Sequence, residues 1–554
     1  MSTYSDASLI FYPSGYKESK LYSLKPTDGS GDLTFTRASS ATRVNEQGLI
    51  EGVITNLALR SEEFDNAVWA GTVGVTKLAN QAIAPDGTNT MDLITFPLSN
   101  SSISQGINVV SGQPYTFSVW LSTQSGTVDA EIGNVNVGVY QSVTVTTTPT
   151  RFTITQNASA ATRYPSIRAI NPCSLLVWGG QLQEGSSATE YIKTEGTAVS
   201  VGMLANVPRI DYTSGCGKLL LEPQRTNLQT QSNGFLSNWT INEVTTSVGE
   251  STLISGETTT LITETAVNAV HRVVSVLTVS LTIGSVYTIS FYAKSNGTRN
   301  IGLRTGFTGS SANIIFNPNT QTAVSVPAGF TTNITAANDG YYRYSITATS
   351  GVASDLISVV MFNGTSLVYT GTSESIYISA IQTEQGSYPT SYIPTTSTAV
   401  TKVADISNTT GLSSIMGQTT GSIYFEFSQI NQFSNEDIFA FDADNSNYIR
   451  FRTSGAGALL IRVNNAGSIS FATFINPIVD NTKYKILIRY ANGDFRVEVN
   501  GVRVLTETYS FNTSVTYDKL LISAVTGSNN AKISGVQLYK TFLSDAEAIA
   551  LTTI

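Results

Sequence analysis

The chain contains the same domain twice. The openings of the two copies match at a constant displacement of 171 positions, with Thr55, Asn56, Leu57, Ser61 and Phe64 in the first copy and Thr226, Asn227, Leu228, Ser232 and Phe235 in the second. Further along, PYTFSVWLSTQSGT (114–127) is matched by VYTISFYAKSNGT (286–298), and both copies close on Thr-Ala-Val, at 197–199 and 398–400. Agreement at several separated places in the same order indicates an internal duplication. We therefore expect residues 55–199 and 226–400 to fold alike.

The composition predicts an all-β protein. Charged residues make up 13% of the 554-residue chain, against about 25% for an ordinary globular protein. Serine and threonine together provide roughly a quarter of the chain, whereas Leu, Ala and Gly lead an average composition. Small polar and β-branched residues suit turns and pleated strands. We expect several antiparallel β-sandwiches, with little helix beyond the C-terminal tail.

A polar stretch, TKVADISNTTGLSS, separates the second copy from a C-terminal block of alternating strands. The pairs Asn492-Gly493 and Asn500-Gly501 each lie between two alternating runs, which is the strongest short pattern for a hairpin. The tail LSDAEAIALTTI has helical spacing, and Ser544 or Asp545 can provide its N-cap.

Charge and residue counts exclude several function classes. The net charge of −8 argues against nucleic-acid binding, which needs a basic surface. A histidine-based nucleophilic triad would have to use His271, the one histidine, and no Cys/His zinc cluster can be assembled. Cys173 and Cys216 are expected to be small buried residues and not a disulfide.

No targeting or membrane segment is recognisable. The start, MSTYSDASLIFYPSGYK, has an early Asp and lacks the apolar core of a signal peptide. Residues 273–292 are the longest apolar-looking run, but Ser and Thr alternate through it and Gly284 interrupts it, which favours strands and a turn. We expect a soluble protein that is made in the cytoplasm and is not inserted in a membrane.

Several segments resemble structural proteins of tailed bacteriophages. YPTSYIPTTSTAVTKVADI (388–406) is similar to the closing strand of their carbohydrate-binding-module-like jelly rolls, and TNLALRSEEFDNAVW and TNLQTQSNGFLSNW to the start of that domain. ISGVQLYKTFLSDAEAIAL (533–551) is similar to the last strand and helix of concanavalin-like, laminin-G-like jelly rolls. The resemblance implies a small N-terminal β unit (1–54 plus 200–225), jelly roll 1 (55–199), jelly roll 2 (226–403) and a C-terminal jelly roll (404–554).

One difference from these phage proteins predicts that jelly roll 1 is an inserted domain. Residues 32–51 and 205–228 resemble two segments that usually follow each other directly, but here jelly roll 1 lies between them. Insertion is tolerated where the termini of a domain lie close together. We therefore expect residues 32–51 to contact residues 205–222.

The resemblance implies a non-enzymatic virion protein, a head or tail fibre or decoration. Its N-terminal unit would bind other virion proteins, its jelly rolls would attach to host-surface glycans, and it would form a homotrimer. Linked weak sites raise apparent affinity by about 10²–10⁴ when they engage together. The alternative is a glycan-degrading or glycan-binding bacterial protein that is not part of a virion.

A glycosidase needs two carboxylates that face the scissile bond. The stretch of this chain that is most similar to such a pair runs from Glu436 and Asp437 to Asp442. It lacks the Glu-x-Asp-x-x-Glu pattern that glucanase-like members of the concanavalin-like fold show on one strand. Asp437 and Asp442 are five positions apart, an odd offset, so a regular strand would place them on opposite faces. We therefore expect no catalytic residue, no enzymatic activity and no organic cofactor.

Two further groups remain candidates for binding. Asp442, Asp444, Asn445 and Asn447 could provide oxygen ligands for calcium, or they could form a polar turn whose side chains cap their own backbone. The four tryptophans, which are Trp69, Trp120, Trp178 and Trp239, could stack on sugars, although core packing is favoured for each. The sequence does not single out a glycan-binding residue.

Overall fold

The computed structural model describes residues 3–233, 235, 239–429, 437–453, 458–475, 479, 482–508, 512–522 and 530–554. These residues form antiparallel β-sheets, with α1 (Thr3–Asp6), the 3-10 turn η1 (Asn338–Gly340) and α2 (Asp545–Thr552) as the helical elements of the described part. The all-β fold class is thereby confirmed. The chain divides into two compact units, one made of Gly52–Gly202 and Val248–Thr259, the other of Met1–Glu51, Met203–Ser247 and Thr260–Ile554.

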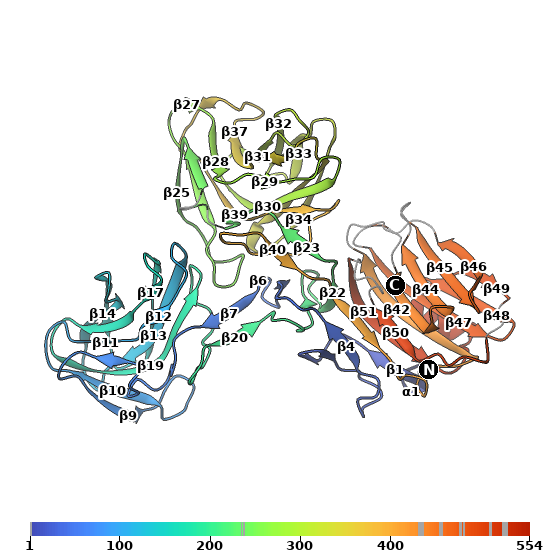
Figure 1. Cartoon of the computed structure of the whole chain (residues 1–554), viewed down its shortest axis with the longest axis horizontal. Helices are drawn as coiled ribbons and strands as arrows, with labels where there is room; N and C mark the ends of the chain where they lie inside the picture. The colour runs from blue at the N-terminus through green and yellow to red at the C-terminus, as the bar shows by residue number, and fades with distance from the viewer. Residues whose placement is uncertain are drawn as a thin grey trace. The chain divides into compact units, whose positions relative to one another are not determined.

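Jelly roll 1 belongs to the smaller unit and consists of two five-stranded sheets that enclose one core (Figure 1). The first sheet has the order β16 (Thr150–Asn157), β13 (Pro114–Ser122), β19 (Cys173–Glu184), β10 (Met91–Phe96) and β9 (Thr76–Ala82). The second has the order β15 (Val139–Val145), β14 (Val128–Asn134), β18 (Pro165–Ala169), β11 (Ser102–Ser104) and β8 (Ala70–Gly71). Two short ribbons complete it, β12 (Ile107–Asn108) with β17 (Thr162–Arg163), and β7 (Val53–Asn56) with β20 (Val199–Gly202).

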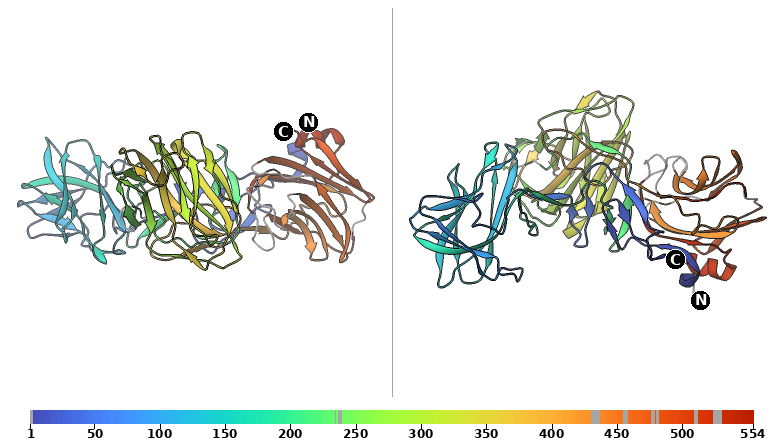
Figure 2. Two further views of the ribbon diagram at one scale, coloured as in Figure 1. Left: turned by 90° about the horizontal axis from the view of Figure 1, so that it is seen from above. Right: turned by 60° about the horizontal axis from the view of Figure 1, so that its bottom comes forward.

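Jelly roll 2 lies in the larger unit and has two six-stranded sheets. Figure 2 shows this roll, in green and yellow, in two further views. The first has the order β24 (Trp239–Asn242), β28 (His271–Ser275), β37 (Ser358–Phe362), β31 (Asn300–Thr305), β32 (Ala312–Asn317) and β33 (Thr322–Ser325). The second has the order β25 (Val244–Val248), β26 (Thr260–Glu264), β39 (Ser375–Gln385), β30 (Val286–Asn296), β35 (Tyr342–Thr349) and β34 (Phe330–Ala336). The ribbons are β27 (Asn268–Ala269) with β38 (Tyr369–Thr370), β29 (Val279–Ser280) with β36 (Ser354–Asp355), and β23 (Arg225–Asn227) with β40 (Val400–Lys402).

The C-terminal sandwich packs an eight-stranded sheet on a nine-stranded one around a large core. The first contains β21 (Ile210–Asp211), β22 (Lys218–Leu221), β51 (Ala531–Tyr539), β42 (Gly421–Gln429), β47 (Lys483–Ala491), β48 (Asp494–Val499) and β49 (Val502–Glu507), and β1 (Ala7–Phe11) also pairs with β51. The second has the order β2 (Tyr16–Lys17), β3 (Lys20–Leu21), β4 (Leu33–Thr36), β41 (Ile406–Thr409), β50 (Lys519–Ile522), β43 (Asp437–Asp444), β44 (Asn447–Thr453), β45 (Leu459–Asn465) and β46 (Ser468–Ile475).

Local sequence patterns account for the turns that were predicted. The hairpins β47–β48 and β48–β49 turn at Asn492-Gly493 and Asn500-Gly501. Asn500 and Gly501 have φ values of 49° and 84°, a backbone region that Asn and Gly tolerate best. Helix α2 begins at a capping box in which the Ser544 hydroxyl accepts from the Glu547 amide and the Glu547 carboxylate accepts from the Ser544 amide.

The two jelly rolls share a buried asparagine framework. The side-chain amide of Asn56 donates to the carbonyls of Gly180 and Ile192 and accepts from the amides of Ala58 and Leu182. Asn227 makes the same four contacts at the equivalent places, with Ile381, Ile393, Gln229 and Thr383. Because both side chains are fully buried and use all of these contacts, each fixes the entering strand to the closing segment of its own roll.

The predicted contact between residues 32–51 and 205–222 is present. The Val44 amide donates to Asp211, the Tyr212 amide donates to the Val44 carbonyl, and the Arg43 guanidinium donates to the Ile210 carbonyl. The flanking strands β1, β4, β21 and β22 do not form a sheet of their own, and they extend the two sheets of the C-terminal sandwich. Pairing with a larger sheet satisfies edge groups that so short a segment could not satisfy alone.

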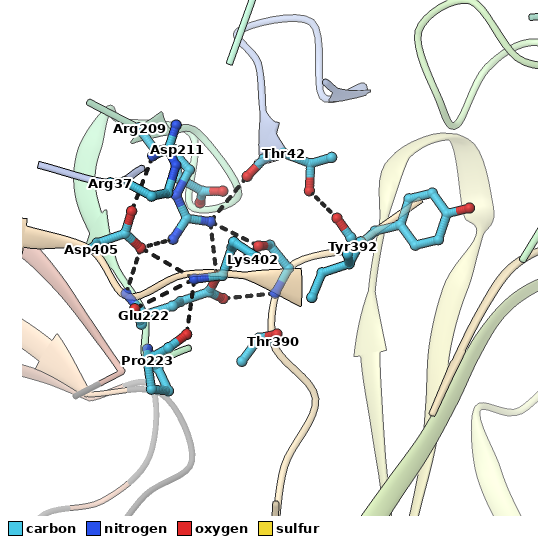
Figure 3. A network of polar contacts seen from close by, with 12 residues as sticks. Arg37, Thr42, Arg209, Asp211, Glu222, Pro223, Thr390, Tyr392, Lys402 and Asp405 are labelled. Carbon is cyan, nitrogen blue, oxygen red and sulfur yellow. Dashed lines mark hydrogen bonds and ion pairs between the residues drawn. The ribbon is translucent and has the colours of Figure 1, made fainter. Parts of the chain in front are cut away.

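Five buried charged side chains tie these segments together (Figure 3). Asp405 accepts from Arg37 at 3.1 Å and from Arg209, and Lys402 lies 3.5 Å from the same carboxylate. Glu222 accepts from Arg209 at 2.8 Å and also accepts from the amide and hydroxyl of Ser391. The network therefore joins the N-terminal segment, the connector after jelly roll 1, and both ends of jelly roll 2.

Candidate functional site

Two of the four tryptophans belong to the cores of the jelly rolls. Trp69 packs on Phe64 with ring centroids 4.4 Å apart, and its indole N–H donates to the Arg60 carbonyl at 3.1 Å. Trp239 packs on Phe235 and donates to the Gln231 carbonyl in the same way. Both are buried, so core packing is confirmed for this pair.

The other two tryptophans lie in jelly roll 1, on the face of the first sheet that is turned away from its core. Trp178 is 3% exposed and belongs to a small second hydrophobic cluster, so it too packs as a buried residue, whereas Trp120 is only partly buried against that cluster. Along β13 the side chains of Phe117, Val119 and Leu121 enter the core, so Trp120 points to the opposite face. Trp120 is directly opposite Trp178 of β19, and their rings are 5.2 Å apart. Tyr191 completes the group, with its ring 4.6 Å from Trp178 and 5.6 Å from Trp120. We call Trp120, Trp178 and Tyr191 the aromatic face.

The surroundings of the aromatic face combine apolar and polar groups. A row of leucines, Leu78, Leu93 and Leu176, crosses β9, β10 and β19 beside it, and Leu78 is 54% exposed. On another side the Arg151 guanidinium lies 4.5 Å from the centre of the Trp120 ring.

Polar contacts fix the edge of the aromatic face. The Tyr191 hydroxyl donates to Glu62, which also accepts from Lys193 at 2.6 Å. Burial raises the pKa of Tyr191, so its hydroxyl stays protonated at neutral pH. The buried indole nitrogen of Trp178 has no hydrogen-bond partner among the described residues. The Trp178 ring is buried, whereas the Trp120 and Tyr191 rings are partly exposed beside fixed polar groups, a combination that suits the binding of a sugar.

The equivalent face of jelly roll 2 is different. Tyr292, Ser379 and Tyr392 stand at the positions of Trp120, Trp178 and Tyr191. Tyr392 is only 4% exposed, and its carbonyl accepts from the Thr42 hydroxyl (Figure 3). The neighbouring Ser391 hydrogen-bonds to Glu222. Residues of the N-terminal segment and the connector therefore contact this side of jelly roll 2.

The expectation that Asp437 and Asp442 lie on opposite faces is wrong. β43 is irregular between Asp437 and Phe439, and Ile438 and Phe439 both enter the core. This bulge turns Asp437 to the outer face, where Arg450 lies 3.4 Å from Asp437 and 2.6 Å from Asp442. Burial raises the pKa of Asp442 to about 6, against the effect of its hydrogen bonds to Arg450. Glu436 lies outside the described residues.

The four calcium candidates do not present a common set of free oxygens. Asp442 is bound to Arg450, and Asp444 accepts from the Ser446 amide and from the side-chain nitrogen of Asn447. The Asn447 oxygen accepts from the Ala466 amide, and Asn445 is exposed. Because these contacts use the ligand oxygens within the protein, the geometry does not fit calcium and favours a polar turn between β43 and β44.

The remaining sequence candidates lie in ordinary places. His271 is buried in β28, with its ring nitrogens 2.6 Å and 3.2 Å from the carbonyl oxygens of Glu243 and Tyr369. Neither cysteine is in a disulfide, as expected, but the expected burial is wrong: Cys216 is exposed in the turn between β21 and β22, and Cys173 is only partly buried. Within the described residues, no group of three or more His, Cys, Asp or Glu side chains is placed to hold a metal ion.

Neither α1 nor α2 has the length to cross a bilayer, and the described part contains no longer helix.

Two features of the surface are not predictable from the sequence alone. An open pocket of about 440 Å³ on jelly roll 2 is lined by uncharged residues that include Thr308, Ser310, Asn313 and Ser325. A group of arginines, Arg450, Arg452 and Arg462, lies on the outer face of β44 and β45. The alternating segments YIRFRT and LLIRVNN contain the arginine pattern, but only the strand register shows that Arg450 and Arg462 are opposite each other.

No protein-family model and no curated protein sequence matches the chain. Parts of it are similar to solved carbohydrate-binding and lectin-like jelly-roll domains. The N-terminal CBM22-1–CBM22-2 tandem of Paenibacillus barcinonensis Xyn10C is 13% identical and is matched over 60% of this chain and 98% of its own, with a TM-score of 0.21. Domain 4 of the arabinanase AbnA from Geobacillus stearothermophilus, solved with arabinotriose, is 13% identical over 30% of this chain and 83% of its own, with a TM-score of 0.23. A carbohydrate esterase of the Shiga toxin-encoding bacteriophage phi24B is 15% identical and is matched over 25% of this chain and 75% of its own, with a TM-score of 0.20. At these scores no functional conclusion follows from the likeness.

Proposed function

We propose that the chain is a non-enzymatic protein of a tailed-bacteriophage virion, a head or tail fibre or decoration, that attaches to host-surface glycans. The observation that supports it is the difference between the two copies. Their buried frameworks agree contact by contact, and Tyr191 is matched by Tyr392, yet jelly roll 1 has Trp120 and Trp178 where jelly roll 2 has Tyr292 and Ser379. Divergence at the partly exposed Trp120 and the buried Trp178 beneath it, on an unchanged framework, suits a binding role.

In this proposal the parts of the chain have different tasks. The N-terminal segment binds other virion proteins, and the protein acts as a homotrimer on the virion. Repetition of weak sites in a trimer raises the apparent affinity without new contacts. Immunogold labelling of intact virions with an antibody to the C-terminal sandwich tests the location, because a complete absence of gold on an accessible epitope contradicts a displayed virion protein. Light scattering of the purified chain tests the trimer.

The Trp120→Ala variant is expected to bind host glycans about tenfold more weakly per site, since one aromatic contact contributes about 0.5–1.5 kcal/mol beyond area burial. Glycan arrays and adsorption of reconstituted virions measure the effect. Trp120→Phe keeps a ring at the position and is the matched control, expected to retain most binding. Equal glycan binding by the wild type and Trp120→Ala, with both folded, would rule out the aromatic face as the site.

One observation favours the second candidate, a glycan-degrading enzyme. The bulge in β43 brings Asp437 and Asp442 to one face, and a carboxyl whose pKa is raised to about 6 suits a general acid. Arg450 contacts both carboxylates, however, and holds them as ion pairs. Incubation with host capsular polysaccharide decides between the candidates, because released reducing ends that vanish in Asp442→Asn would establish the enzyme.

A further inference from the structure

The outer face of β44 and β45 has an unbalanced positive charge. Ile449, Phe451, Ile461 and Val463 of these strands enter the core, so the residues between them point outward. Arg450 and Arg462 are directly paired across the two strands. Like charges opposite each other in an antiparallel pair destabilise it unless something compensates for them.

Only part of this charge is compensated within the described chain. Asp437 and Asp442 form ion pairs with Arg450, and Asp437 also accepts from Arg452 at 2.9 Å. Arg462 has no hydrogen-bond or ion-pair partner among the described residues, and its buried Nε atom is unpaired. Its guanidinium lies 5.9 Å from the centre of the Tyr448 ring, a contact that supplies no counter-charge. Three arginines therefore face two carboxylates, and the surplus charge is on Arg462.

A second unpaired group lies beside Arg462. Asn464 is 6% exposed, and its amide nitrogen donates to the Tyr448 hydroxyl at 3.2 Å, but its amide oxygen has no hydrogen-bond partner within the described part of the chain. Rotating the amide by 180° would exchange the two atoms and leave the nitrogen unpaired instead. Either way a buried polar atom remains unsatisfied, which is unfavourable unless a ligand supplies the partner. The Arg462 guanidinium, which has no anionic partner among the described residues, thus lies next to an Asn464 amide group with one unpaired polar atom.

We propose that this face binds the carboxylate of an acidic saccharide, a sugar acid that bears hydroxyl groups. Arg462 would bind the carboxylate through its planar fork, which matches that group in two parallel hydrogen bonds. Asn464 would accept from a neighbouring hydroxyl of the same sugar. Neither a neutral sugar nor a simple carboxylate supplies both groups. The choice of a saccharide rests on the proposed function, whereas the binding of an anion does not.

The test compares three probes on the full-length protein by isothermal titration calorimetry. D-glucuronate has a carboxylate and hydroxyls, D-glucose has only hydroxyls, and acetate has only the carboxylate. We expect glucuronate to bind at least tenfold more tightly than either of the others, and to weaken as salt is added. Equal binding of glucose would overturn the acidic preference, equal binding of acetate would overturn the saccharide, and no binding of glucuronate would overturn the site.

Variants separate this site from the aromatic face and from misfolding. Arg462→Gln should lose at least tenfold in glucuronate affinity, and Arg462→Lys, which keeps the charge without the fork, should lose less. Arg452→Gln on the same face is the matched control and should bind like the wild type. Trp120→Ala should also bind glucuronate normally. A negative result at the aromatic face therefore does not contradict the Arg462 site, and a negative result at the Arg462 site does not contradict the aromatic face. Unchanged glucuronate binding by Arg462→Gln contradicts the proposal. As a separate check, the Nε–H signal of Arg462 in ¹⁵N-arginine spectra should shift when glucuronate is added.

Discussion

Asp405→Asn is expected to lower the free energy of unfolding of the larger unit by about 3–5 kcal/mol, the usual cost of breaking a buried ion pair. The change leaves Arg37, Arg209 and Lys402 as three buried cations with Glu222 as their remaining carboxylate. Their side chains are 0–1% exposed, so water cannot replace the lost partner. Denaturant unfolding of the full chain, followed by a probe in the larger unit, measures the loss.

The matched control for this variant is Asp339→Asn. Asp339 pairs with Lys294 at 3.0 Å but is 45% exposed, and surface pairs of this kind contribute about 0–1 kcal/mol. Asp339 has a φ of 53°, which Asn tolerates well, so the substitution adds no backbone strain. If both variants lose the same amount, the buried network does not have the role described for it.

The same network makes the larger unit sensitive to acid. Burial alone would raise the pKa of Asp405, but Arg209, Lys402 and Arg37 outweigh it and hold that pKa below the usual value. The pKa of Glu222 is lowered in the same way by Arg209 and Lys402. For carboxyls whose pKa is depressed in the folded state, the stability is present above their unfolded pKa of about 4 and is lost as the pH falls below it. Asp405→Asn should show a smaller loss of stability between pH 5 and pH 2 than the wild type.

Asn56→Ala is expected to destabilise the smaller unit by about 4 kcal/mol. The change leaves four buried backbone groups without their partner, those of Ala58, Gly180, Leu182 and Ile192. Each such group costs about 1–3 kcal/mol, reduced by local relaxation. Two-step denaturant unfolding should show the midpoint of the smaller unit shifted and that of the larger unit unchanged.

Two further variants check this assignment. Asn227→Ala removes the equivalent contacts and should shift the larger unit instead. Asn171→Ala replaces an exposed residue of jelly roll 1 and should change stability by no more than about 0.5 kcal/mol. A shift of the same transition by Asn56→Ala and Asn227→Ala would show that the two frameworks do not act separately.

The fold was predictable from the sequence where the pattern is local. Alternation, the two Asn-Gly hairpins and the Ser544 cap each depend on a few adjacent residues, and each appears in the structure as expected. The duplication was visible because Asn56 and Asn227 make the same buried contacts and therefore recur with their neighbours.

The candidate sites were less predictable because they depend on register and on distant segments. One extra residue in β43 reversed the face of Asp437, and a strand pattern cannot show such a bulge. Arg37, Arg209 and Asp405 are far apart in the chain, so their network could not be inferred from spacing. That Arg462 lies opposite Arg450 and has no carboxylate partner among the described residues depends on the strand register, which spacing alone does not reveal.

The paired ribbons at the bases of the jelly rolls have an evolutionary consequence. In β7 and β20, as in β23 and β40, the chain enters and leaves a roll through two adjacent hydrogen-bonded strands. Excising everything between such strands leaves two ends that a few residues can rejoin. Recombination at these paired strands would therefore replace a whole roll without cutting any strand of its two main sheets.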